Sequence, residues 1–159
     1  MDIKTVIITL VALAALVALP AIGAHIMRKK RRELSLRQLS DFAGAAGCHI
    51  SEFEILYDVI LGLDAANLQL FFLRLTPEHE TSQQIDLKNV TRCRKSESGR
   101  TIGDAHVIDR IDLEFQTIDR KSPSVNIYNV EYDKLNLTDE IPFAEKWASK
   151  ITAVLKQST

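Results

Sequence analysis

The spacing of hydrophobic side chains changes twice along the chain, and each change marks a different kind of element. Residues 5–27 contain no Asp, Glu, Lys or Arg. Residues 33–46 then place apolar side chains at the three- and four-residue intervals of a helix, which Gly47 is suited to end. Beyond Gly47 the hydrophobic period falls to two, which indicates β-strands, and helical spacing returns near residue 140.

The uncharged run over residues 5–27 predicts a transmembrane helix. At about 1.5 Å per residue it is long enough to cross the ~30 Å hydrocarbon core, and Pro20 would bend the helix without ending it. The cytoplasmic flank of a membrane span carries an excess of Lys and Arg. We therefore interpret the five consecutive cations that follow the run as this flank: Arg28, Lys29, Lys30, Arg31 and Arg32.

These features predict a single-pass protein of the inner membrane, with residues 1–4 outside and the C-terminal domain in the cytoplasm. The bilayer would be contacted through residues 5–27. A cleaved signal peptide is the alternative, because residues 21–24 offer small side chains where a peptidase could cut. Two features weigh against cleavage. The segment before the apolar run is not basic, and the five cations would have to cross the membrane first.

Six runs between residues 48 and 132 have the composition or the alternation of β-strands. Residues 64–67 open with Asp and close with Asn, which predicts the turn of a hairpin. Alternation is clearest over residues 110–117, where we expect one buried and one solvated face, as in an antiparallel sheet. We also expect a bulge between Leu87 and Val90 and a mobile loop over residues 95–104. The expected strands are residues 50–56, 59–63, 68–75, 83–95, 110–117 and 124–132.

The end of the chain has the pattern of an amphipathic helix. Pro142 falls in the first turn, where its missing N–H is harmless, and Thr138 or Asp139 is the expected N-cap. Trp147 is the only tryptophan, and its place on the apolar stripe predicts a core residue that covers the sheet. The stripe consists of Phe143, Trp147, Ile151 and either Val154 or Leu155.

The order of these parts resembles the pleckstrin-homology-like fold. The residues that carry the resemblance are VILGLDAANLQLFF as an opening hairpin, IDLKNVTRC as a kinked middle strand, IDLEF as a late strand and FAEKWASKI as a capping helix. The whole chain is also similar to a family of uncharacterised bacterial single-pass membrane proteins. The resemblance implies an α+β protein whose N-terminal transmembrane helix precedes a pleckstrin-homology-like antiparallel β-barrel, closed by the C-terminal amphipathic helix.

Four parts of the chain follow from this interpretation. They are a short external N-terminus (1–4), a transmembrane helix (5–27), a basic flank with a juxtamembrane helix (28–47) and a pleckstrin-homology-like domain (48–159).

Phosphoinositide-binding members of this class use basic residues around the first hairpin loop, and this chain departs from that pattern. Residues 56–58 and 64–67 contain no Lys or Arg, so no lipid-site residue can be carried over. A weaker anion or lipid contact remains conceivable at the nearest basic cluster, although a solvated strand face is the simpler interpretation of such a charge run. This cluster consists of Arg92, Arg94, Lys95 and Arg100.

Composition limits the chemistry further. The 159 residues are 46% hydrophobic and 26% charged, which predicts that part of the chain folds. Cys48 and Cys93 lack the spacing of a zinc site, and no motif for a cofactor, a metal or catalysis is present. We interpret two pairs of carboxylates, Glu52/Glu54 and Asp112/Glu114, as solvated strand faces. We therefore expect no enzyme, no catalytic residues, no cofactor and no metal.

The net charge of −1 conceals a division within the chain. Residues 28–32 carry +5, whereas residues 33–159 carry −6. A part with charge −6 is repelled by anionic lipid, and it lacks the basic surplus that nucleic acid requires.

These charges favour a protein partner. The sequence predicts a membrane-anchored, non-catalytic cytoplasmic domain with an interaction or scaffold role, whose partner is a membrane or cytoplasmic protein. Contact is expected through residues 95–104 or through the face of Arg110, Asp112, Glu114 and Gln116. The alternative is a lipid-responsive module that binds anionic headgroups through the basic cluster of Arg92, Arg94, Lys95 and Arg100.

Overall fold

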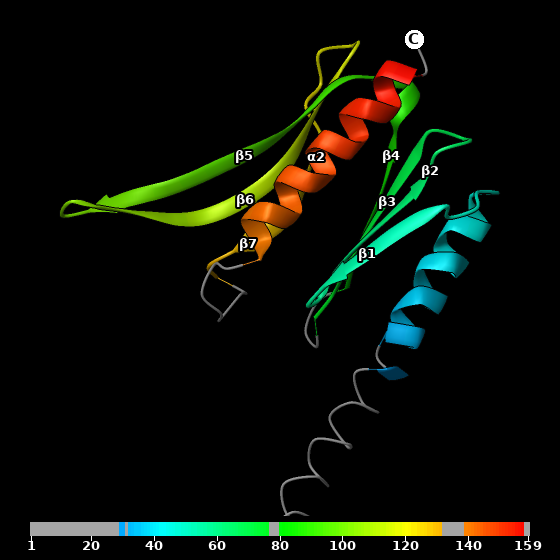
Figure 1. Ribbon diagram of the computed structural model, residues 1–159, viewed down its shortest axis with the longest axis horizontal. Helices are drawn as coiled ribbons and strands as arrows, with labels where there is room; N and C mark the ends of the chain where they lie inside the picture. The colour runs from blue at the N-terminus through cyan, green and yellow to red at the C-terminus, as the bar shows by residue number, and fades with distance from the viewer. Residues whose placement is uncertain (1–28, 31, 77–79, 132–138, 158–159) are drawn as a thin grey trace, which may run out of the picture. The chain divides into compact units, whose positions relative to one another are not determined.

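The chain divides into two compact units, residues 1–38 and residues 39–159. The computed structural model describes residues 29–30, 32–76, 80–131 and 139–157. The described residues of the first unit are helical, and this helix ends at residue 45. The second unit holds all the described strands and the C-terminal helix (Figure 1).

Two antiparallel sheets and a helix make up the second unit. Strands β1 to β4 form a four-stranded sheet in chain order, and β5 to β7 form a three-stranded sheet in chain order. Helix α2 packs mainly against the three-stranded sheet. The elements are β1 (Glu52–Leu56), β2 (Val59–Asp64), β3 (Gln69–Leu75), β4 (Glu80–Asp86), the 3-10 turn η1 (Leu87–Asn89), β5 (Val90–Ile102), β6 (Ala105–Thr117), β7 (Ser124–Asn129) and α2 (Glu140–Gln157).

The predicted pleckstrin-homology-like barrel is wrong, because within the described residues the two sheets stay open and do not pair with each other. The reason lies in η1. The Asp86 carboxylate accepts hydrogen bonds from the backbone N–H of Lys88 (3.1 Å) and from Asn89 Nδ2 (2.9 Å), which holds the chain in a tight turn. The irregular spacing between Leu87 and Val90 therefore marks the point where one strand ends and the next begins in another sheet.

The predictions of a transmembrane helix and a single-pass inner-membrane topology are also corrected. No helix among the described residues is both long enough and apolar enough to cross a bilayer. The described part of the helix that ends at residue 45 carries charged side chains such as Glu33, Arg37 and Asp41. Residues 5–27, on which the prediction was based, lie outside the described residues.

The predicted end of the N-terminal helix is confirmed. Gly47 has φ +69°, a left-handed conformation that glycine adopts readily. The N–H of Cys48 donates to the Ala43 carbonyl (2.9 Å) and the N–H of Gly47 to the Gly44 carbonyl (3.0 Å), which is the hydrogen-bond pattern of a Schellman motif.

The central strands β2 and β3 of the four-stranded sheet are buried on both faces, which explains why β2 is almost continuously apolar. One face joins the main core with α2 and the second sheet. The other face is covered by Leu39 and Ala43 of the N-terminal helix, which pack against Ile60, Phe71 and Leu73. Every residue of β2 is buried. Because neither face of this strand is solvated, its sequence does not alternate between apolar and polar residues.

Helix α2 carries the predicted apolar stripe, and Trp147 is a core residue as expected, fully shielded from solvent. Its indole Nε1–H donates to Glu54 Oε2 in β1 (3.0 Å), and Lys146 Nζ contacts Glu54 Oε1 at 2.9 Å. Lys150 forms an ion pair with Glu52. The interpretation as a solvated strand face is confirmed for Glu52, whose side chain is 53% exposed, whereas Glu54 is half-buried; both carboxylates also bind the helix.

Residues 95–102 belong to strand β5 and residues 103–104 form a turn, in place of the expected mobile loop. β5 and β6 pair along their length, from Val90 opposite Thr117 to Ile102 opposite Ala105. Gly103 has φ +62° in the two-residue turn that joins them. A Cβ at Gly99 would lie 2.1 Å from the Val107 carbonyl oxygen, so the close strand approach at this bulge requires glycine.

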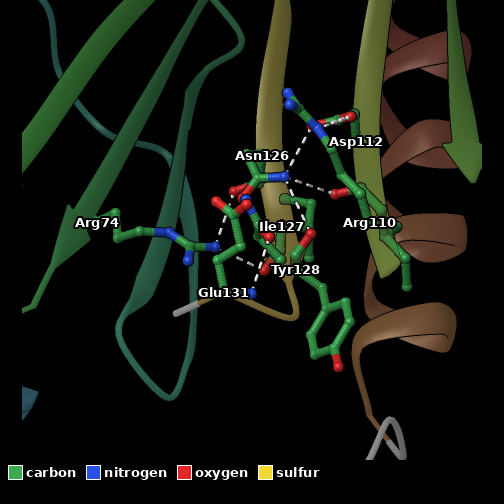
Figure 2. A network of polar contacts seen from close by, with 9 residues as sticks. Arg74, Arg110, Asp112, Asn126, Ile127, Tyr128 and Glu131 are labelled. Carbon is green, nitrogen blue, oxygen red and sulfur yellow. Dashed lines mark hydrogen bonds and ion pairs between the residues drawn. The ribbon is translucent and has the colours of Figure 1, made fainter. Parts of the chain in front are cut away.

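A buried arginine links the two sheets. Arg74 of β3 is 6% exposed, and its Nη2 donates to the carbonyls of Asn126 (3.1 Å) and Ile127 (2.9 Å) in β7. Its Nη1 lies 3.8 Å from an Asp58 carboxylate oxygen. Figure 2 shows this guanidinium reaching the β7 backbone, beside Asn126 Nδ2, which donates to Asp112 Oδ1 (2.9 Å).

We predict that Arg74→Met lowers the free energy of unfolding by about 2–4 kcal/mol, because it leaves buried carbonyls without a donor and Asp58 without its cation. Arg94→Met is the matched control, since the Arg94 side chain is 64% exposed in its ion pair with Glu114, and we expect it to lower stability by less than about 1 kcal/mol. Urea unfolding of both variants measures the difference. Equal losses would show that Arg74 does not join the sheets.

Asp64 makes the stability of the second unit depend on pH. Burial raises the pKa of Asp64, but hydrogen bonds from the Asn67 side chain and from the backbone of Asn67 and His49 lower it more, so its pKa lies below the ordinary value. Since the ordinary carboxyl pKa of about 3.9 applies to the unfolded chain, this stabilisation is present above that pH. It is lost as the pH falls through the lower pKa of the folded state.

We therefore predict that the free energy of unfolding falls less in Asp64→Asn than in the unsubstituted protein as the pH is lowered from about 5 to about 2. Asp104→Asn removes one exposed carboxylate and controls for net charge. Urea midpoints at pH 7, 5 and 3 measure the effect. Parallel pH profiles for all three proteins would contradict the role of Asp64.

Candidate binding groove

A hollow of about 700 Å³ lies at the corner where the chain passes from one sheet to the other. Its walls come from η1, the first residues of β5, the turn between β6 and β7, and the last turns of α2. Figure 1 shows the C-terminal end of α2 close to this passage from β4 to β5. We call this hollow the corner groove. Its lining residues are Leu68, Leu87, Lys88, Val90, Thr91, Arg92, Ile118, Thr152, Leu155 and Lys156.

The floor of the corner groove is apolar because buried residues of the main core lie directly beneath it. Leu87, Val90 and Leu155 are 1%, 6% and 9% exposed and belong to the main core, and Leu68 packs against them. Leu87 is held in place by its backbone N–H, which donates to the Leu68 carbonyl (2.8 Å).

Local irregularities bring the polar residues to the rim. Between Val90 and Arg92 the register of β5 shifts, so Thr91 has no partner in the strand register. Such a bulge redirects the side chains that follow it. In α2, Thr152, Leu155 and Lys156 lie three and four residues apart and so share one face of the helix.

The rim of the corner groove is positively charged. Three cations line it, and no Asp or Glu does. Within the described part of the chain, Lys88, Arg92 and Lys156 form no ion pair with a carboxylate. The neighbouring Asp86 carboxylate is occupied by η1 and by Gln69 Nε2 (3.0 Å).

A second hollow, of about 820 Å³, meets the corner groove at Ile118. It lies between the end of β4 and the turn between β6 and β7, with Ile85 and Pro123 in its lining. Ile118 is 69% exposed, although it is a large aliphatic residue. Hydrogen bonds from Thr117 and Lys121 lower the pKa of Asp119 in this second hollow, so its carboxylate is ionised and paired.

The structure keeps only part of the expected basic cluster together, because Arg92 and Arg94 line a small hollow of about 200 Å³ with Glu114, whereas Lys95 and Arg100 do not line it. Arg94 donates two hydrogen bonds to Glu114, which lower the pKa of that carboxyl. Hydrogen bonds to Glu145 and Glu97 raise the pKa of the Lys95 ammonium. Arg100 lies 3.5 Å from Asp109. Of the four predicted residues, Arg92 alone lines the corner groove.

Sequence reasoning missed the other two cations of the groove. Lys88 stands in a segment that was interpreted as continuous strand, and Lys156 is distant in the chain. The interrupted alternation between Leu87 and Val90 was the one local signal that the chain changes direction there. No pattern in the sequence indicates that the end of α2 would reach the same corner.

The expected face of Arg110, Asp112, Glu114 and Gln116 lies opposite the main core, on the outside of β6. Arg110 Nε lies 2.5 Å from Asp112 Oδ2, and Asn126 Nδ2 donates to the other oxygen of that carboxylate. Charges on this face are therefore largely satisfied by one another.

Among the residues that the structure describes, no three His, Cys, Asp or Glu side chains are placed to hold a metal ion. Comparison of the chain with models of protein families, with curated protein sequences and with solved structures found no match. The resemblance to an uncharacterised bacterial membrane-protein family stays a prediction.

The two thiols differ in accessibility. Cys93 lies in the main core, and burial raises the pKa of its thiol to about 12. Cys48 is half-buried at the end of the N-terminal helix, and burial together with the charge of Asp64 raises its pKa. Because the thiolate is the reactive form, both should react more slowly than free cysteine.

We predict that a disulfide reagent at pH 8 modifies one thiol per folded chain and both thiols in denaturant. Cys48→Ser should abolish the reaction of the folded protein, and Cys93→Ser should leave it unchanged. Absorbance of the released thiolate measures the stoichiometry. Modification of Cys93 in the folded state would contradict its position in the core.

Proposed function

We propose that this protein is a non-catalytic interaction domain that binds an extended segment of a partner protein in the corner groove. The observation that supports this most directly is the exposed Ile118 between two open hollows. A large aliphatic side chain on a turn, next to an apolar floor, is the kind of surface that partner proteins cover.

The shape of the site favours an extended segment over an enclosed small molecule. The two hollows adjoin and are open to solvent, whereas small-molecule sites bury most of the ligand surface. The second hollow is lined by Gln84, Ile85 and Asp86 at the end of β4, which is an edge strand of its sheet. Edge strands offer backbone N–H and C=O groups to a peptide that adds as a further strand.

The alternative of a lipid-responsive module has less support. It relied on four cations acting together, and three of them, Arg94, Lys95 and Arg100, already lie in ion pairs with carboxylates. Charges that are satisfied within the protein gain less from an anionic surface, because binding would first have to separate them.

The proposal is tested by selecting a displayed library of random peptides on the full-length protein and measuring affinities for the selected sequences. Ile118→Glu should reduce their affinity at least tenfold, because a carboxylate replaces the aliphatic contact at the centre of the site. Ile102→Glu is the matched control, since Ile102 is 58% exposed at the far end of the β5–β6 ribbon.

Affinity that falls with Ile102→Glu and survives Ile118→Glu would place the interaction on the ribbon and overturn this proposal. Circular dichroism of both variants confirms folding, which exposed positions should leave intact.

A further inference from the structure

The cations of the corner groove differ from almost all others in the second unit. Apart from Arg120, every other Lys and Arg described there lies within 4.0 Å of a carboxylate. Lys88, Arg92 and Lys156 are thus three of the few described cations without such a partner, and they line one hollow. Residues 33–159 carry a net charge of −6, so this cluster of unpaired positive charge has the opposite sign to the region that surrounds it.

We infer that the partner segment recognised by the corner groove is an acidic peptide. It would place an aliphatic side chain on the floor of Leu87, Val90 and Leu155 and direct carboxylates toward Lys88, Arg92 and Lys156. This inference rests on the proposed function and adds the chemistry of the partner to it.

The two hydroxyl groups of the groove already donate hydrogen bonds within the protein, so the three cations are the groups that would bind an anion. The Thr91 hydroxyl donates to the Gln116 carbonyl (3.0 Å), and the Thr152 hydroxyl donates to the Ala148 carbonyl (2.7 Å). Both protons are therefore engaged. A carboxylate in the groove would find its donors in the guanidinium of Arg92 and the two ammonium groups, and a guanidinium can bind a carboxylate through two parallel hydrogen bonds.

The positions of the three cations also favour pairing with an anion of a bound partner over pairing with a carboxylate of the protein itself. Lys156 lies in the last turn of α2, where the negative end of the helix dipole stabilises a cation without a carboxylate beside it. Lys88 and Arg92 lie on either side of Val90, so their charges can flank one apolar side chain of a partner. Like charges gathered in one hollow repel one another, and a bound carboxylate removes that repulsion.

The test uses the full-length protein and the same unbiased display library of random peptides. Peptides enriched on the unsubstituted protein should carry a net negative charge and one or more aliphatic residues. The triple variant Lys88→Glu, Arg92→Glu, Lys156→Glu should lose them and enrich basic peptides in their place. Single replacements of each cation by Gln should weaken a selected acidic peptide by about threefold each, and added salt should weaken it further.

Arg120→Glu is the matched control, because Arg120 is an exposed cation without an ion pair among the described residues and lies outside both hollows. It lowers the net charge of the protein by two, which is more than each single replacement by Gln does. Its affinity for the selected acidic peptides should stay within twofold of the unsubstituted protein. An equal loss with Arg120→Glu would mean that net charge and not the groove selects the peptides, which overturns the inference.

The outcomes separate this inference from the proposed function. Enrichment of peptides without charge bias that still depend on Ile118 would overturn the acidic partner and leave the interaction domain standing. Absence of any peptide that depends on Ile118 would overturn both. Binding to vesicles containing anionic lipid that requires Lys88, Arg92 and Lys156, with no peptide enriched, would also overturn the inference and identify a lipid surface as the occupant.

Discussion

The second unit depends on the turn at Leu87–Asn89, where the Asp86 carboxylate binds two N–H groups that follow it. The carboxylate satisfies the backbone N–H of Lys88, which a strand would have paired with its neighbour, and it also binds the side-chain amide of Asn89. The chain therefore leaves the first sheet, and β5 starts a second one. This change of direction places the buried Leu87 and Val90 beneath a hollow beside the end of α2, so the turn that divides the sheets also creates the corner groove.

The two sheets are held together by contacts of different physical kinds. Apolar side chains of both sheets and α2 form the main core, which supplies most of the stabilisation. Directed polar contacts then fix how the parts meet, with Arg74 at the β7 backbone and Glu54 at the Trp147 indole. Such buried polar groups are expensive to leave unpaired, so they exclude arrangements that the apolar core alone would tolerate.

Sequence reasoning succeeded where a pattern reflects a local cause. The alternation over Arg110–Thr117, the apolar stripe with Trp147 and the glycine end at Gly47 all depend on residues near one another in the chain. It failed where the structure depends on distant contacts. Glu52 and Glu54 share the spacing of a solvated face, and only the packing of α2 shows that they bind lysines. Residues 95–104 have the composition of a loop, yet pairing with β6 makes residues 95–102 a strand. The corner groove combines residues from four separated segments, and no local pattern in the sequence predicts that they meet.

The β5–β6 ribbon creates a gradient of local stability along the second sheet. β7 pairs with β6 only from Arg110 to Glu114, so beyond Arg110 the ribbon is two strands wide. Two-stranded ribbons are marginal in water, and amides in such regions exchange with solvent through local opening. The ribbon end can therefore unpair and close again while the groove, more than half of β5 away, keeps its core residues packed. Backbone fluctuations within the second sheet would thus be concentrated far from the surface that we propose for recognition.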